Sequence, residues 1–158
     1  MARRSRALPS LIRSAVILLA LFGGGYFLWS QMKNRTTGDF SGTWTITNTV
    51  TKSNYKSYIG EVYVYKMYVI QDGNTIKGEG EQTRYNGKPA KHHYAIAFTD
   101  GLVKDDELIL TYKMQASREI TGQFILRTDT DGDGVLSGVF TSSGADSKGT
   151  CEVRIERN

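Results

Sequence analysis

The stretch Gly42-Thr43-Trp44-Thr45-Ile46-Thr47 decides the fold that the sequence predicts. Its large apolar residues, Trp44 and Ile46, alternate with threonines, so one face of the segment is apolar and the other is polar. This period of two, with β-branched residues in between, is typical of a half-buried strand. We therefore expect an antiparallel sheet to begin here.

Beyond this segment, turn residues recur at short intervals and no helical pattern separates them. Such spacing indicates an all-β sandwich or barrel. The predicted strands cover residues 42–50, 61–71, 74–84, 92–103, 107–114, 119–127, 135–142 and 149–157. Their succession predicts an all-β, eight-stranded antiparallel up-and-down barrel over residues 39–158.

The expected turns define a register for three hairpins. A two-residue turn at Asp72-Gly73, a strong hairpin signal, pairs Val69 with Ile76, Met67 with Gly78, Tyr65 with Gly80 and Lys66 with Glu79. The loop at 115–119 pairs Met114 with Ile120, Tyr112 with Gly122, Leu110 with Phe124 and Leu108 with Leu126. The loop at 127–135 pairs Leu126 with Leu136, Phe124 with Gly138 and Gly122 with Phe140. Large residues thus face glycines repeatedly, as in the tapered interior of a small barrel.

The N-terminal part divides into a basic tail (1–13), an apolar segment (14–31) and a linker (32–38). Residues 15–29 carry no charge, and with the residues before them they approach the ~20 needed to cross a bilayer. We expect a transmembrane helix; a cleaved signal peptide and a buried helix are the alternatives. Arginines precede the segment, so the positive-inside rule favours a cytoplasmic N-terminus and an extracytoplasmic barrel in a single-pass protein.

The net charge of +4 comes from this N-terminal part, because the chain from Thr36 onward holds 14 Lys or Arg against 16 Asp or Glu. A folded domain with an excess of acidic residues has little electrostatic attraction for duplex nucleic acid, which we exclude as a partner. The single cysteine, Cys151, excludes an intrachain disulfide. It shares the inward parity of Val153, so we expect a small buried side chain there.

Several inward positions carry tyrosine, and a buried phenol needs a hydrogen-bond partner. Together with nearby glycines, these hydroxyls suggest a partly hydrated pocket for a small aromatic or amphipathic ligand. The candidate ligand-binding residues are Tyr63, Tyr65, Met67, Gln71, Gln82, Tyr94 and Tyr112. The alternative is a filled core with the tyrosine hydroxyls in water at the rims.

Gly42-Thr43-Trp44 resembles the Gly-x-Trp signature of lipocalins and the wider calycin group. In that family the tryptophan plugs one end of the barrel, and an arginine from near the chain's end stacks on it. The resemblance implies these roles for Trp44 and for Arg157, which shares the inward parity of Val153 and Ile155. The chain departs from true lipocalins because it lacks their disulfide and a C-terminal helix pattern.

A membrane segment followed by a small barrel also resembles the membrane-anchored β-barrel effectors of bacterial cyclic-oligonucleotide antiphage defence. The similar fragments are Val69-Ile70-Gln71, Leu110-Thr111-Tyr112 and Leu136-Ser137-Gly138-Val139-Phe140. This resemblance implies a cytosolic barrel with a nucleotide ligand. Those effectors carry two membrane helices, whereas this chain has room for one.

Asp129, Asp131 and Asp133 match the first acidic positions of a calcium-binding loop, and Gly134 occupies its turning position. The twelfth position should hold a bidentate glutamate, but Phe140 stands there, so any calcium binding would be weak. The alternative is an acidic hairpin loop. No other cofactor is indicated.

No nucleophile lies in a catalytic motif beside His92 or His93, so the sequence predicts a protein that is not an enzyme. We expect a membrane-anchored barrel that binds or senses a small ligand. The alternatives are a membrane effector driven by a nucleotide or by self-association, and a structural or accessory subunit whose barrel contacts a protein partner in a membrane complex.

Overall fold

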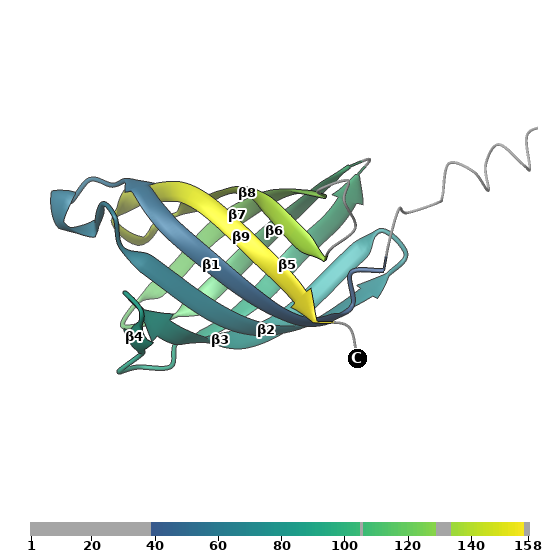
Figure 1. The fold of residues 1–158 in the computed structure, drawn as a ribbon, viewed down its shortest axis with the longest axis horizontal. Helices are drawn as coiled ribbons and strands as arrows, with labels where there is room; N and C mark the ends of the chain where they lie inside the picture. Colours follow the sequence, from purple (N-terminus) through teal and green to yellow (C-terminus); the bar gives the residue numbers. More distant parts are fainter. Residues whose placement is uncertain (1–38, 105, 129–133, 157–158) are drawn as a thin grey trace, which may run out of the picture. The chain divides into compact units, whose positions relative to one another are not determined.

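The computed structural model describes residues 39–104, 106–128 and 134–156, and these form a closed antiparallel β-barrel (Figure 1). The long strands are β1 (Gly42–Lys52), β2 (Val62–Asp72), β3 (Thr75–Tyr85), β5 (Ala95–Lys104), β6 (Glu107–Gln115), β7 (Glu119–Thr128), β8 (Val135–Ser142) and β9 (Ser147–Glu156). Each pairs with its neighbours in sequence, and β9 returns to pair with β1. The predicted eight-stranded up-and-down barrel is confirmed.

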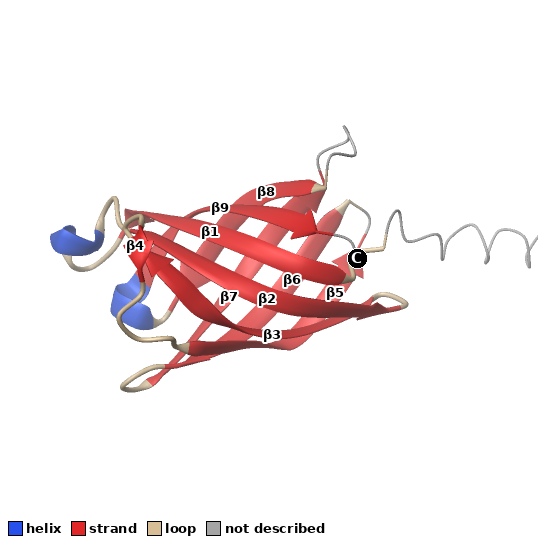
Figure 2. Cartoon of the chain, turned by 60° about the horizontal axis from the view of Figure 1, so that its bottom comes forward, coloured by secondary structure: helices blue, strands red, loops and turns tan. Residues whose placement is uncertain are grey.

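Three short elements lie at one end of the barrel (Figure 2). They are η1 (Lys56–Tyr58), β4 (Lys88–Pro89) and η2 (Gly144–Asp146). The prediction missed β4, which pairs with the end of β3 after a turn at Asn86-Gly87. Both turn residues have positive φ, 48° and 76°, as a type I′ hairpin turn requires. The chain then reaches β5 at Ala95, three residues after the predicted strand start.

The register predicted across the 115–119 loop is confirmed, but the registers of the other two hairpins are wrong. In the β2–β3 hairpin Val69 lies opposite Gly78, because the turn is formed by Gly73 and Asn74 rather than by Asp72 and Gly73. Gly73 takes the first central position with φ of 58°, whereas Asp72 remains in its strand. Lys66 accordingly lies opposite Glu81 instead of Glu79.

The β7–β8 hairpin is shifted in the same way. Leu126 lies opposite Gly138, and Phe124 lies opposite Phe140. A Cβ atom on Gly138 would lie 2.0 Å from the Ile125 carbonyl oxygen, so a glycine is required where β7 approaches so closely. Both shifts are by two residues, which leaves every side chain on its predicted face because the period of a strand is two.

Large inward side chains do lie opposite glycines, although with partners that differ in part from those predicted. The pairs are Met67–Gly80, Tyr112–Gly122, Leu126–Gly138 and Phe140–Gly149. Fully buried Trp44 belongs to the core near the start of β1, and its indole Nε1 donates a hydrogen bond to the Phe40 carbonyl oxygen at 2.8 Å. Cys151 is buried, as predicted.

Several predictions fall outside the described residues: the basic tail, the transmembrane helix and the linker within residues 1–38, and the plug residue Arg157. The role of Trp44 as a plug that stacks with Arg157 therefore stays a prediction. In the part of the chain that the structure describes, no helix has the length and apolar character needed to cross a membrane.

Candidate functional site

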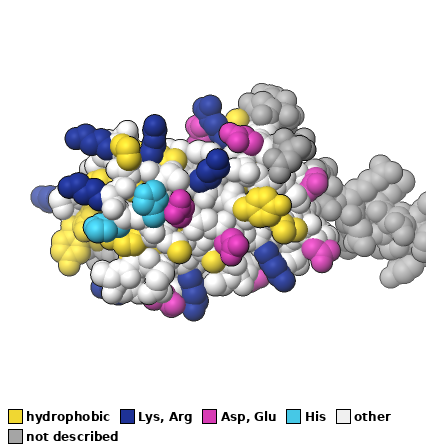
Figure 3. Space-filling view, turned by 90° about the horizontal axis from the view of Figure 1, so that it is seen from below, with side chains coloured by type: hydrophobic (Ala, Val, Ile, Leu, Met, Phe, Trp, Pro, Cys, Tyr) yellow, Lys and Arg dark blue, Asp and Glu magenta, His cyan; other side chains and the backbone are white. Residues whose placement is uncertain are grey.

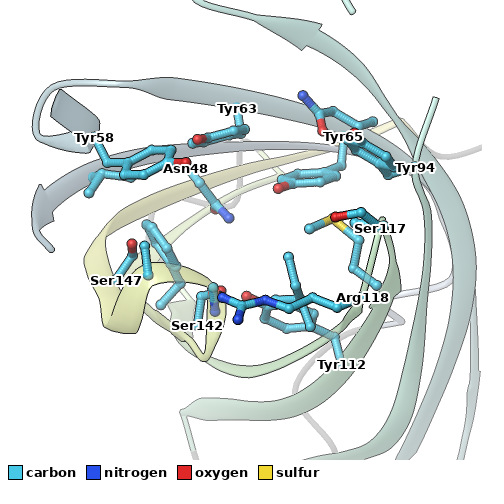
Figure 4. A pocket seen from close by; sticks show the side chains of 18 of the residues that line it. Asn48, Tyr58, Tyr63, Tyr65, Tyr94, Tyr112, Ser117, Arg118, Ser142 and Ser147 are labelled. Atoms are coloured by element: carbon cyan, nitrogen blue, oxygen red, sulfur yellow. The ribbon is translucent and has the colours of Figure 1, made fainter. Parts of the chain in front are cut away.

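A cavity of about 620 Å³ opens at the barrel end that carries η1, β4 and η2 (Figure 4). Its aromatic wall consists of Tyr55, Tyr58, Tyr63, Tyr65, Tyr94, Tyr112 and Phe140. The cavity exists because small residues, among them Ala116, Gly144 and Ala145, line the opening, whereas bulky apolar side chains fill the other end. Its volume is within the range of about 300–1,000 Å³ typical of sites for small organic molecules.

Asn48 of β1 also lines the cavity. It is 3 % exposed, and its Oδ1 is the one buried side-chain polar atom without a hydrogen-bond partner among the described residues. Leaving such a group unpaired costs about 1–3 kcal/mol. Asn48 was not among the predicted site residues, although it shares the inward parity of Trp44 and Ile46 on β1 and could have been found as a polar residue in an apolar series.

Tyr65 and Tyr112 lie deep in the cavity and are 6 % and 4 % exposed. The Tyr112 hydroxyl donates a hydrogen bond to the Thr141 carbonyl oxygen at 3.1 Å, and its ring stacks on Phe124 with centroids 4.7 Å apart. Burial raises the pKa of both tyrosines above the ordinary value. Both phenols therefore remain neutral at physiological pH and present uncharged polar atoms to the cavity.

At the rim, one carboxylate holds two tyrosines. Tyr63 and Tyr85 both donate hydrogen bonds to Glu61, one to each carboxylate oxygen, and their ring centroids are 5.2 Å apart. Burial, followed by the bond to Glu61, raises the pKa of Tyr63, and the Glu61 bond raises the pKa of Tyr85 to about 12. The cluster joins the loop before β2 to the end of β3 and so fixes this side of the opening.

The structure gathers most of the predicted ligand-binding residues in the cavity. The lining includes Tyr63, Tyr65, Gln82, Tyr94 and Tyr112. Gln82 is 5 % exposed and donates a long hydrogen bond of 3.4 Å to the Arg84 carbonyl oxygen, and Tyr94 stacks on His92.

Met67 and Gln71 lie outside the cavity lining. Met67 is buried in the core. Gln71 lies near the start of β1, where its Oε1 accepts a hydrogen bond from the Phe40 amide at 2.8 Å and its Nε2 donates one to the Gly73 carbonyl oxygen. A ligand role for these two residues stays a prediction that the cavity does not support.

The structure offers no metal site among residues 39–104, 106–128 and 134–156, since no cluster of three or more His, Cys, Asp or Glu side chains occurs there. On the outer wall of the barrel, His93 Nδ1 lies 3.4 Å from Glu81 Oε2. The calcium candidates Asp129, Asp131 and Asp133 lie outside the described residues.

No model of a known protein family and no curated protein matches the chain. Its fold is similar to solved structures of redesigned β-barrels. The redesigned beta barrel b11L5F_LGL is 18 % identical with a TM-score of 0.56, and the match covers 75 % of this chain and 92 % of that chain. The redesigned beta barrel mFAP1, bound to DFHBI, is 17 % identical with a TM-score of 0.55, covering 74 % and 94 %. At this level of identity the likeness establishes an eight-stranded closed β-barrel and nothing finer.

Proposed function

We propose that this chain is a non-enzymatic β-barrel that binds a small organic molecule in the cavity at its open end. The observation that carries the proposal is Asn48, a buried amide whose oxygen lacks a partner among the described residues, on a cavity wall made mostly of tyrosines. Because neighbouring atoms cover this oxygen, a ligand N–H or O–H group would satisfy it only after the Asn48 amide turns toward the cavity. The similar barrels mFAP1 and mFAP0, both bound to DFHBI, support the capacity of such a fold to hold one small molecule.

The proposal includes anchoring of the barrel to a membrane through residues 14–31, with the barrel on the extracytoplasmic side, because arginines precede this apolar segment. The cavity favours ligand binding over the accessory-subunit alternative, because a barrel that served only as a rigid surface would need no interior space. A non-catalytic role is proposed because the tyrosines, amides and serines that line the cavity include no nucleophile paired with a base.

Titration of the full chain with the neutral fluorophore N-phenyl-1-naphthylamine tests the proposal. We expect saturable binding at one site with enhanced emission. Ala116 lies in the cavity lining, so Ala116→Trp should fill the opening and weaken binding by about tenfold or more. Ala97 is exposed on the outer wall, so Ala97→Trp is the matched control and should bind normally. Binding that is absent from the wild type, or equal in all three proteins, would refute the proposed site.

A second expected result concerns stability. Asn48→Leu should raise the free energy of unfolding by about 1 kcal/mol, because it removes an unpaired buried polar group. Gln82→Leu is the control: its amide has a partner, so its loss should not stabilise the barrel. Urea unfolding of both variants provides the measurement. Destabilisation by Asn48→Leu would mean that the amide is already satisfied and is not kept for a ligand.

A further inference from the structure

Among the described residues, the charge on the wall of the cavity is positive. Among the described residues that line it, Arg118 is the one charged side chain, and none is acidic. The remaining polar groups are neutral amides, serine hydroxyls and tyrosines, and burial keeps the phenols of Tyr65 and Tyr112 protonated. An anion that enters this cavity therefore meets no negative group on its wall, whereas a cation meets a guanidinium.

Arg118 has no competing partner in the part of the chain that the structure describes. It is an exposed residue between β6 and β7, and in Figure 4 its side chain extends along the cavity on the side of Tyr112. The adjacent acidic residue, Glu119, is instead directed to Lys113, with 3.4 Å between Nζ and Oε1. The guanidinium is thus available to a carboxylate or sulfonate, for which its planar donor geometry is suited.

The surroundings of the opening carry more basic than acidic residues, although Asp146 of η2 and Glu119 of β7 also lie there. Figure 3 shows Lys and Arg side chains gathered around the left end of the barrel, where the histidines also lie, with most acidic side chains further right. Basic residues of the strand ends and loops at the opening are Lys52, Lys56, Arg84, Lys88, Lys91 and Lys148. The carboxylate of Glu61 is occupied by Tyr63 and Tyr85. A potential of this kind raises the local concentration of anions.

We propose that the cavity selects organic anions, namely molecules with a flat apolar body and one carboxylate or sulfonate group. The acidic group would lie beside Arg118, the body against Tyr65 and Tyr112, and an N–H or O–H of the ligand toward Asn48. This inference rests on the proposed function and specifies the class of ligand.

Two fluorophores that differ only in a sulfonate group test the inference on the full chain. 1-Anilinonaphthalene-8-sulfonate is N-phenyl-1-naphthylamine with that one group added, and both carry an N–H donor. Because Arg118 is exposed to solvent, we expect Arg118→Gln to weaken binding of the sulfonate by about fivefold, which corresponds to about 1 kcal/mol, and to change binding of the neutral compound by less than about twofold.

Arg154→Gln removes the same charge from the outer wall and should leave both affinities unchanged. Ala116→Trp should weaken binding in the cavity and leave binding elsewhere unchanged, so a signal that it does not reduce comes from probe bound outside the cavity. If both compounds bind the cavity and Arg118→Gln weakens neither or weakens both equally, the selection of anions is refuted and ligand binding stands. If neither compound binds the wild-type cavity, the proposed function fails, and this inference fails with it.

Discussion

Replacement of Trp44 by alanine is expected to lower the free energy of unfolding by about 4 kcal/mol. The indole is fully buried, packs edge-on against Phe98 with ring centroids 6.0 Å apart, and donates its Nε1 hydrogen to the Phe40 carbonyl oxygen. Truncation would leave a large void and an unpaired carbonyl group. Urea unfolding followed by far-ultraviolet circular dichroism would measure the loss.

Trp44→Phe is the matched variant, because it keeps an aromatic ring but removes the hydrogen bond to Phe40. Its loss of stability should be less than half that of Trp44→Ala. Trp44 lies outside the cavity lining, so Trp44→Phe should bind N-phenyl-1-naphthylamine as the wild type does. A loss below about 1 kcal/mol for Trp44→Ala would contradict the close packing of this end of the barrel.

The second large effect is expected at Gly138, where β8 passes β7. A Cβ atom there would lie 2.0 Å from the Ile125 carbonyl oxygen and 2.9 Å from the Leu126 Cα atom. These are backbone atoms of a paired strand, so the clash is relieved only if the strands separate. We expect Gly138→Ala to lower the free energy of unfolding by about 3 kcal/mol, measured in the same way.

Gly87→Ala provides the control for this substitution. A Cβ atom on Gly87 would meet no atom within 4 Å beyond its chain neighbours, but the φ of this residue is 76°. The substitution therefore carries a backbone penalty of about 1–2 kcal/mol without a steric clash. If Gly138→Ala cost no more than Gly87→Ala, the close approach of β7 and β8 would be wrong.

Much of the fold was predictable because strands alternate with a period of two. The inward positions of Tyr65, Met67, Val69 and Tyr112 follow from alternation alone, and all four are buried. The same period explains the errors in register. A pairing moved by two residues buries the same side chains, so the apolar pattern could not distinguish Gly78 from Ile76 as the partner of Val69.

The candidate site was predictable only in part. Tyrosines at inward positions indicated a hydrated interior, and most of them line the cavity. Asn48 and Arg118 were missed because their importance depends on what surrounds them: the first lacks a partner among the described residues, and the second belongs to a loop whose direction no periodic pattern determines. Gln71 was named as an amide that could bind polar atoms of a ligand, yet its amide is bonded to Phe40 and Gly73 at the start of β1.

The amino-acid sequence by itself determined the class of fold, the number of long strands and the face on which most side chains lie, because these depend on local alternation and turn residues. In β5 the alternation reverses after Phe98, where an irregularity shifts the register. Only the tertiary structure decided the partner of each strand residue, the closing pairs between β1 and β9, and the position of the cavity. The physical reason is that these features depend on contacts between residues far apart in the chain. At Gly138, for example, the approach of a neighbouring backbone selects one register among several with the same buried face.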